Sequence, residues 1–209
     1  MQMETIPVGL YEANCIIAWE DPRAAWIIDP GGEERAILAT LAAHGLSPSL
    51  VALTHAHFDH IGAIPGILRA FPSLPVHIAP GETAVISDPR NCREPDYPRI
   101  APVETLAPDL ADGSTLSSGG LAAEILHTPG HTPGSTCFLF HAAGTIATGD
   151  TLFAGSCGRT DFPGGSAQDM RTSLARLATL PPELRVIPGH GPDTTIAREI
   201  ATNPYMSGL

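Results

Sequence analysis

The chain has 209 residues, 43% of them hydrophobic, so we expect residues 1–209 to form a single domain with a substantial core. Its formal net charge is -11, from 22 acidic and 11 basic residues. This excess of acidic groups argues against a nucleic-acid partner, whose phosphates need a basic face.

The cysteines and the N-terminal segment indicate the compartment. Cys15, Cys92, Cys137 and Cys157 are widely spaced and form no CxxC pair, which argues against a zinc ribbon and suits a reducing cytosol. The N-terminus lacks a basic segment followed by an apolar one, and no apolar run reaches about 18 residues. We therefore expect a cytoplasmic protein with no membrane segment.

The spacing of apolar residues predicts alternating strands and helices. Short runs of Ile, Val and Leu between glycines and prolines predict strands, and helical spacing predicts helices. Strands that precede and separate helices indicate mixed sheets covered by helices, an α/β (α+β) fold. The predicted strands are Thr5–Leu10, Asn14–Trp19, Ala25–Ile28, Leu50–Thr54, Val76–Ile78, Leu121–His127, Thr136–Phe140, Thr145–Thr148 and Arg185–Ile187. The predicted helices are Glu33–His44, His60–Phe71, Pro80–Ser87, Gln168–Leu180 and Thr195–Asn203.

Residues 88–108 interrupt this pattern. The segment is rich in proline and charged residues, which predicts a long connection on the surface. Both a lid over a site and a simple loop are compatible with this composition.

The stretch THAHFDHIG, residues 54–62, holds three histidines and one aspartate where a predicted strand turns into a predicted helix. Imidazole nitrogens and carboxylate oxygens are good donors to divalent metals. His55 and His57 are two residues apart, so in an extended segment their side chains point to the same side. Asp59 and His60 follow as the chain turns. The four side chains can therefore aim at two neighbouring points.

Three further metal donors follow predicted strands, each beside a glycine. They are His131 in TPGHTPGS, Asp150 in ATGDTLF and His190 in VIPGHGP. Together with the first cluster they give five histidines and two aspartates. Zinc takes about four ligands, so this set is too large for one ion and suits two ions that share a carboxylate and a water.

These motifs, with GDTLFAGSCGRTDFPGG, resemble the metallo-β-lactamase superfamily, in its short bacterial branch similar to glyoxalase II, across residues 14–204. The resemblance implies a four-layer αββα sandwich with metals at one edge of the paired sheets. It implies His55, His57 and His131 as ligands of a first metal, Asp59, His60 and His190 as ligands of a second, and Asp150 as a bridge between them.

Two neighbouring ions would lower the pKa of a shared water, and the resulting hydroxide would attack a bound carbonyl whose oxygen the ions polarise. Asp59 is the expected catalytic residue, which accepts a hydrogen bond from this hydroxide and aims it. Because a thiolate leaves easily, the site suits thioesters, and the resemblance implies hydroxyacylglutathiones such as S-D-lactoylglutathione. Zinc is the expected metal, and iron or manganese also fit these donors.

Substrate contacts depart from glyoxalase II itself. Its loop after the bridging aspartate carries a lysine and a tyrosine that contact glutathione, whereas GSCGRTDF here has Arg159 at the lysine position and no tyrosine. Arg159 is the candidate to bind a substrate carboxylate, and a salt bridge with Asp161 is the alternative role. Only 19 residues follow His190, so we expect no C-terminal helical glutathione-binding domain.

Residues outside the motifs receive weaker interpretations. Asp29 in IIDPGG stands where family members carry an aspartate, so it is a candidate to orient a ligand, or only part of a turn. His44, His77, His127 and His141 are expected to be surface or packing residues.

Other functions remain open at this point. Persulfide dioxygenases share the fold and a GCGRTDF-like loop, but use a single iron held by two histidines and one aspartate. Metal identity and oxygen uptake would distinguish them. A lactonase and a non-enzymatic metal-binding module are further alternatives. A β-lactamase is less favoured, because that branch often lacks the histidine after the motif aspartate and a bridging aspartate.

Overall fold

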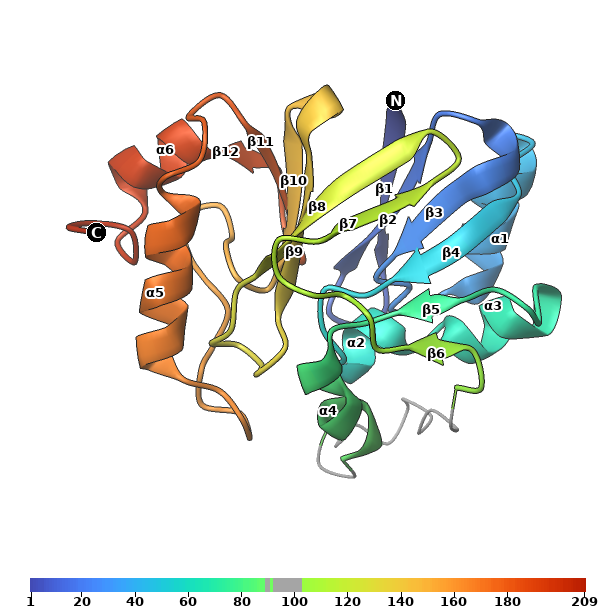
Figure 1. The fold of residues 1–209 in the computed structure, drawn as a ribbon, viewed down its shortest axis with the longest axis horizontal. Helices are drawn as coiled ribbons and strands as arrows, with labels where there is room; N and C mark the ends of the chain where they lie inside the picture. The colour runs from blue at the N-terminus through green and yellow to red at the C-terminus, as the bar shows by residue number, and fades with distance from the viewer. Residues whose placement is uncertain (89–90, 92–102) are drawn as a thin grey trace.

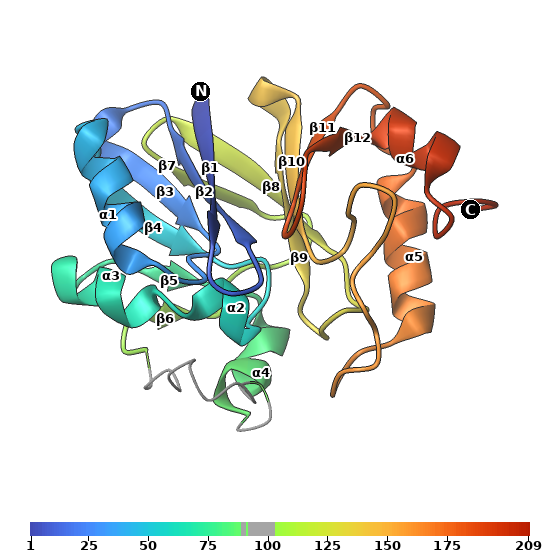
Figure 2. The same ribbon diagram turned by 180° about the vertical axis from the view of Figure 1, so that it is seen from behind.

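The computed structural model describes residues 1–88, 91 and 103–209. Two mixed sheets pack face to face, and helices cover the outer face of each, as Figures 1 and 2 show. This arrangement confirms the predicted αββα sandwich.

The first sheet comes from the N-terminal half of the chain, and its strands lie side by side in chain order. The first three strands pair with one another in antiparallel fashion, and the third to the sixth pair in parallel. The strands are β1 (Gln2–Val8), β2 (Ala13–Trp19), β3 (Ala25–Ile28), β4 (Pro48–Ala52), β5 (Val76–His77) and β6 (Leu106–Ala107).

The second sheet comes from the C-terminal half and has the order β12-β11-β10-β9-β8-β7. Only β10 and β11 pair in parallel in this sheet; the other described pairs are antiparallel. The strands are β7 (Thr115–Ser118), β8 (Leu121–His127), β9 (Thr136–Phe140), β10 (Thr145–Gly149), β11 (Arg185–Pro188) and β12 (Thr194–Thr195).

The helices form the outer layers. In Figures 1 and 2, α1 and α3 cover the first sheet, and α5 and α6 cover the second. None of the helices in the described part of the chain has the length and apolar content needed to cross a membrane. The helices are α1 (Glu34–Ala43), α2 (Phe58–Ile61), α3 (Ile64–Ala70), α4 (Thr83–Ser87), α5 (Ala167–Leu177) and α6 (Ile196–Thr202), with 3₁₀ turns η1 (Pro22–Ala24), η2 (Pro80–Glu82) and η3 (His141–Ala143).

The strands β2 and β3 are buried on both faces, which explains why their residues are mostly apolar. Successive side chains of β2 and β3 alternate between two apolar layers. Ile17 and Ile27 face the helices, whereas Ile16 and Ile28 face the second sheet. A third apolar layer lies between the second sheet and its helices. This packing fixes the strand ends from which the candidate site is built.

Two predicted elements need correction. The first strand is Gln2–Val8 rather than Thr5–Leu10, because Gly9 takes a left-handed φ of 74° and turns the chain into β2. The predicted helix His60–Phe71 divides into α2 and α3. Pro65 explains the break, because it has no N–H to donate to the carbonyl of Ile61.

The strands that the sequence did not reveal, β6, β7 and β12, are two to four residues long. The β6 strand lies within the proline-rich segment 88–108. Residues 89–90 and 92–102 of that segment lie outside the described residues, so the choice between a lid and a loop stays a prediction.

Candidate metal centre

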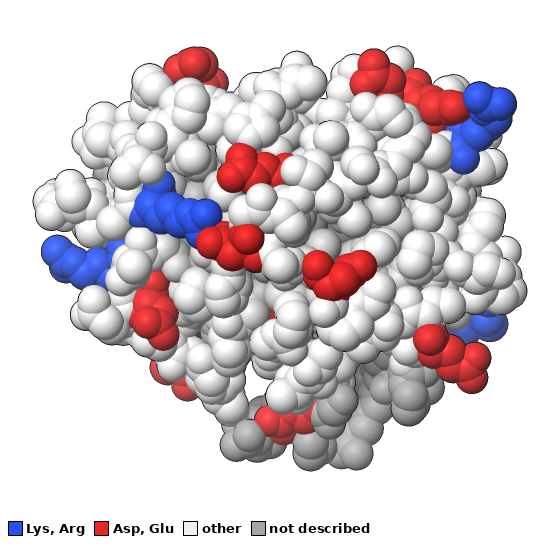
Figure 3. Space-filling model, in the orientation of Figure 1, with Lys and Arg blue, Asp and Glu red and all other residues white. Residues whose placement is uncertain are grey.

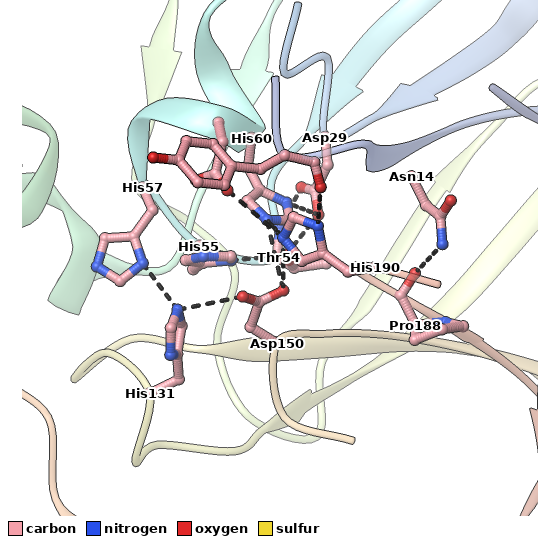
Figure 4. Close-up of polar contacts among 12 residues, drawn as sticks. Asn14, Asp29, Thr54, His55, His57, His60, His131, Asp150, Pro188 and His190 are labelled. Atoms are coloured by element: carbon pink, nitrogen blue, oxygen red, sulfur yellow. Dashed lines mark hydrogen bonds and ion pairs between the residues drawn. The ribbon is translucent and has the colours of Figure 1, made fainter. Parts of the chain in front are cut away.

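All seven predicted donors meet at one edge of the sandwich, where β4, β8, β10 and β11 end (Figure 4). The turn after β4 supplies four of them, and the ends of β8, β10 and β11 supply one each. The seven residues are His55, His57, Asp59, His60, His131, Asp150 and His190.

Three buried histidines, His55, His57 and His131, form what we call the histidine group. Their donor nitrogens lie within 4.8 Å of one another. His57 Nδ1 is 2.7 Å from His131 Nε2. Burial, reinforced by neighbouring imidazoles, lowers the pKa of His55 well below its usual range and that of His57 to about 3. His55 and His57 are therefore neutral at physiological pH and offer lone pairs.

Asp59, His60 and His190 form the second cluster, which we call the aspartate group. His190 Nε2 lies 3.4 Å from Asp59 Oδ2 and 3.2 Å from His60 Nε2. Burial opposes charge on these imidazoles, but the Asp150 and Asp59 carboxylates outweigh it and raise the pKa of His60 well above its usual range. Against the same opposition from burial, the hydrogen bond to Asp59 raises the pKa of His190.

Asp150 lies between the two groups, as Figure 4 shows. Its Oδ2 is 3.4 Å from His131 Nε2, and its Oδ1 is 3.4 Å from His60 Nε2 and 3.7 Å from His190 Nε2. Although burial opposes ionisation, His60 holds the pKa of Asp150 well below its usual range. One oxygen of an ionised carboxylate therefore faces each group, as the predicted bridge requires.

The donor set fits a pair of divalent cations. Within the described residues, His55 Nε2 and Asp150 Oδ1 are buried without a hydrogen-bond partner. Buried polar atoms are nearly always satisfied, so such orphans call for a bound group. Imidazole nitrogens that converge on one another, as in both groups, leave lone pairs facing a common point. The His and Asp clusters are thus consistent with a dinuclear metal site.

Several contacts hold the ligand rings in orientation. Asp29, whose φ is +50°, accepts bonds from the Thr54 N–H at 2.8 Å and the Thr54 hydroxyl at 2.6 Å. Its Oδ2 also lies 3.1 Å from His60 Nδ1, which leaves His60 Nε2 facing Asp150. Asp29 therefore contacts a candidate ligand, as the sequence analysis suggested for one of its two possible roles.

Backbone carbonyls do the same for two other rings. His131 Nδ1 lies 2.7 Å from the Arg159 carbonyl, and His190 Nδ1 lies 2.8 Å from the Tyr11 carbonyl. An acceptor on one ring nitrogen fixes the tautomer and leaves the other nitrogen free to bind metal. The sequence gives no signal for these partners, because any residue supplies a carbonyl.

Asn14 and Gly189 are site residues that the sequence analysis missed. Asn14 Nδ2 donates to the carbonyls of Pro188 and Gly191, both at 2.9 Å, and so fastens the loop of His190 to β2. A Cβ atom on Gly189 would lie 2.2 Å from Asp150 Oδ1, so only glycine fits there. A buried asparagine in an otherwise apolar strand was the available signal for Asn14.

A cavity of about 1040 Å³ opens above the donors. Its lining combines donor side chains with aromatic residues, among them Tyr11, Phe58, Phe153 and Phe162. The Phe162 ring meets the His57 ring edge to face, with centroids 5.3 Å apart. The metal centre is therefore the floor of a partly apolar pocket, as expected for a small-molecule site.

Arg159 lies at the rim of this cavity and is exposed. Its Nε and Nη2 each donate to an Asp161 carboxylate oxygen at 2.6 Å, and its guanidinium lies 4.1 Å from the Phe162 ring centroid. The hydrogen bond from Arg159 lowers the pKa of Asp161 to about 2. The salt bridge with Asp161, which the sequence analysis gave as the alternative role of Arg159, is therefore present. Arg159 also lies beside the cavity.

The remaining histidines have other partners. His44 lies 2.7 Å from Glu4, His77 lies 2.9 Å from Asp109, and His141 lies 2.7 Å from Glu124. His127 Nε2 is 3.0 Å from the carbonyl of Pro133.

A model of the metallo-β-lactamase superfamily matches residues 8–190, which include all seven donors. The chain belongs to the metallo-β-lactamase superfamily. Among its relatives is the hydroxyacylglutathione hydrolase GloC of Haemophilus influenzae, 34% identical over 213 residues that cover 99% of each chain.

Solved structures of the superfamily superpose closely. The BLEG-1 B3 metallo-β-lactamase has a TM-score of 0.89 at 34% identity, over 99% of this chain and 100% of that one. TTHA1623 in a di-iron-bound form has a TM-score of 0.82 at 36% identity, over 97% and 99% of the two chains. Close superposition over nearly full length therefore extends both to a metallo-β-lactamase and to a protein that binds two irons.

Proposed function

We propose that the protein is a dinuclear metal-dependent hydrolase of thioesters, of the hydroxyacylglutathione type exemplified by S-D-lactoylglutathione. Superfamily membership and the His and Asp clusters support the broader statement that it is a metallo-hydrolase. The observation that carries the proposal is Asp150, whose two oxygens face two separate donor groups below one cavity.

Two divalent cations, held by the histidine and aspartate groups with Asp150 between them, would supply Lewis acidity and a water of lowered pKa. Asp59 lines the cavity, and although burial opposes ionisation, His60 keeps its pKa below the usual range. It therefore remains a hydrogen-bond acceptor at neutral pH and can orient a water towards a bound carbonyl. The site suits thioesters because a thiolate leaves without a proton from the protein.

The aromatic lining and Arg159 would receive the rest of the substrate. Phe58, Phe153 and Phe162 offer apolar contact close to the donors. Arg159 would bind a carboxylate of the thiol carrier in place of Asp161. Its salt bridge with Asp161 is exposed to solvent and therefore weak enough to be exchanged. The proposed partner is thus a small-molecule thioester linked to glutathione, and we propose a cytoplasmic location.

The outer surface agrees with a small-molecule substrate. Figure 3 shows acidic side chains scattered over one face, with basic side chains beside some of them and no broad basic patch among the described residues of that face. Exposed ion pairs of the protein include Arg176 with Asp112 and Arg185 with Asp193. This pattern supports the proposal that nucleic acid is not a partner.

Zinc is the proposed metal, with iron or manganese as alternatives. Imidazole and carboxylate donors accept all three ions, so availability also decides which is bound. The di-iron form of TTHA1623 shows that a structure of this fold holds two irons.

The test is S-D-lactoylglutathione hydrolysis by purified protein, with metals quantified by mass spectrometry in the same sample. We expect turnover with about two metal ions per chain. A cephalosporin is assayed in parallel, because the BLEG-1 lactamase is 34% identical. Cephalosporin turnover without thioester turnover would overturn the proposal.

A persulfide dioxygenase is the second candidate, favoured by the SCGRTDF loop at residues 156–162. It predicts about one iron per chain and oxygen uptake with glutathione persulfide. An oxygen electrode therefore separates the two functions.

A further inference from the structure

The fully buried carboxylate of Glu82 lies next to the candidate metal centre but belongs to neither donor group. Glu82 ends η2 and precedes α4, and its side chain is 0% exposed. Burial of a carboxylate is costly unless hydrogen bonds compensate it. The partners of Glu82 therefore indicate why an acid stands there.

Each oxygen of Glu82 binds a different metal-binding loop. Oε2 accepts the N–H of Ala56 at 2.8 Å, and Ala56 stands between His55 and His57. Oε1 accepts the N–H of Gly134 at 2.7 Å, in the loop that carries His131. One carboxylate thus joins the two loops that provide the whole histidine group.

The surrounding packing makes this link close. A Cβ atom on Gly134 would lie 2.8 Å from Glu82 Oε1, so the loop approaches the acid as only glycine allows. On the other side, Asn91 Nδ2 donates to the carbonyl of Ala56 at 2.6 Å. The peptide groups of Ala56 are therefore held at both the N–H and the carbonyl, which restricts the residues on either side, His55 and His57.

We infer that Glu82 is a positioning residue of the histidine group, which sets the spacing between the His55–His57 turn and the His131 loop and thereby its affinity for metal. The inference rests on the proposed metal centre. It assigns Glu82 no contact with substrate. It also makes a selective claim, because the two backbone N–H groups that Glu82 binds, those of Ala56 and Gly134, flank members of the histidine group and belong to no residue of the aspartate group.

Glu82→Gln is the informative variant. Glutamine has nearly the same shape but only one acceptor oxygen, so it faces one of the two backbone N–H groups with a donor. Glu82→Asp keeps the charge and both acceptors but is one methylene shorter, so it cannot span both loops. Glu82→Asp is the variant to measure if Glu82→Gln does not fold.

Glu199→Gln is the matched control. Glu199 is also 0% exposed and also accepts a backbone N–H, from Gly155 at 2.7 Å. Its other partners are Thr194 at 2.5 Å and Asn203 at 2.9 Å. It fastens α6 to the loop after Asp150, and these three partners all lie outside the two loops that carry the histidine group.

The measurement is a zinc titration of metal-free protein by calorimetry with a competing chelator, resolved into two sites, alongside thermal unfolding. We expect Glu82→Gln to weaken one site by about 10–100-fold and to leave the other nearly unchanged, as loss of an outer partner does. Glu199→Gln should lower the melting temperature comparably and leave both affinities unchanged.

Two results would overturn the inference. Unchanged zinc affinities in Glu82→Gln or Glu82→Asp, with lower thermal stability, would make Glu82 a packing residue only. Equal weakening of both sites would remove the claim of selectivity. The titration requires no turnover, so a wild type that binds two zinc ions but hydrolyses no thioester would refute the proposed function alone. A wild type that binds no metal would refute both.

Discussion

The histidine group and the aspartate group lie under one cavity and share Asp150, yet their imidazoles differ in protonation. Burial dominates at His55 and His57 and lowers their pKa values. At His60 and His190 burial acts in the same direction, but neighbouring carboxylates outweigh it and raise the pKa. The position of the two acidic ligands therefore decides which imidazoles carry protons before metal binds.

This difference has a consequence for loading. Metal binds neutral imidazole, so a proton on a ligand must leave first. His55 and His57 offer neutral nitrogens, whereas His60 and His190 of the aspartate group hold protons more tightly than usual. We expect an ion that enters the histidine group to displace no proton from His55 or His57, and an ion that enters the aspartate group to displace protons from His60 and His190.

The largest expected effect comes from removing a ligand of the histidine group. His57→Ala should abolish binding of an ion at the histidine group, and activity should fall by more than the roughly 100-fold that loss of an outer partner causes. Metal content by mass spectrometry and circular dichroism check this on one sample. A folded, metal-depleted variant with full activity would contradict the site assignment.

The second test is the pH dependence of metal binding. Because the pKa of His60 is raised, its proton competes with metal below that pKa, and affinity at the aspartate group should fall by about tenfold per pH unit per proton. Competition from protons on His55 and His57 should be absent in this range, since the pKa of His55 lies well below its usual range and that of His57 is about 3, so the histidine group should show the shallower slope. Two-site calorimetry between about pH 6 and 8, in buffers of different ionisation enthalpy, counts the protons. Equal slopes at both sites would break the comparison.

Asp29→Asn should give a smaller and selective effect. Asparagine tolerates the left-handed backbone of residue 29 and keeps an acceptor for Thr54, but it removes the negative charge beside His60. We expect about tenfold weaker zinc binding at the aspartate group and a shallower pH slope there. The histidine group is the internal control in the same titration. Loss of affinity at that group alone would refute this role of Asp29.

Arg159→Ala should change least. Its exposed ion pair with Asp161 contributes little to stability, so the melting temperature and both zinc affinities should stay unchanged. The KM for an anionic thioester should rise by about 3–10-fold, because a charge-assisted hydrogen bond is lost. Arg185→Ala, which breaks another exposed pair, is the control. Steady-state kinetics identical to the wild type would reduce Arg159 to the partner of Asp161.

The donors were predictable because their residue types are diagnostic and their places are regular. Each follows a strand, and the chain order of the motifs agrees with the superfamily. The αββα layers were predictable because β2, β3 and β9 are mostly apolar strands between turn residues.

The supporting contacts were not predictable for a physical reason. Glu82 binds backbone N–H groups 26 and 52 residues away, and such groups occur at every residue except proline. Asn14 likewise binds carbonyls more than 170 residues away. A strand of two residues, such as β6 or β12, also has no period to detect.

The order of strands within the two sheets bears on how the protein unfolds. The strands of one sheet lie between residues 2 and 107, and the strands of the other lie between residues 115 and 195. Strand pairing within each sheet is therefore confined to one half of the chain. Four donors belong to the first half and three to the second. Metal binding therefore favours the docked halves by mass action, by about 4 kcal/mol when free metal is at 1,000 times its Kd. A chelator that removes the metal should therefore destabilise the protein mildly, by weakening the contact between the two sheets.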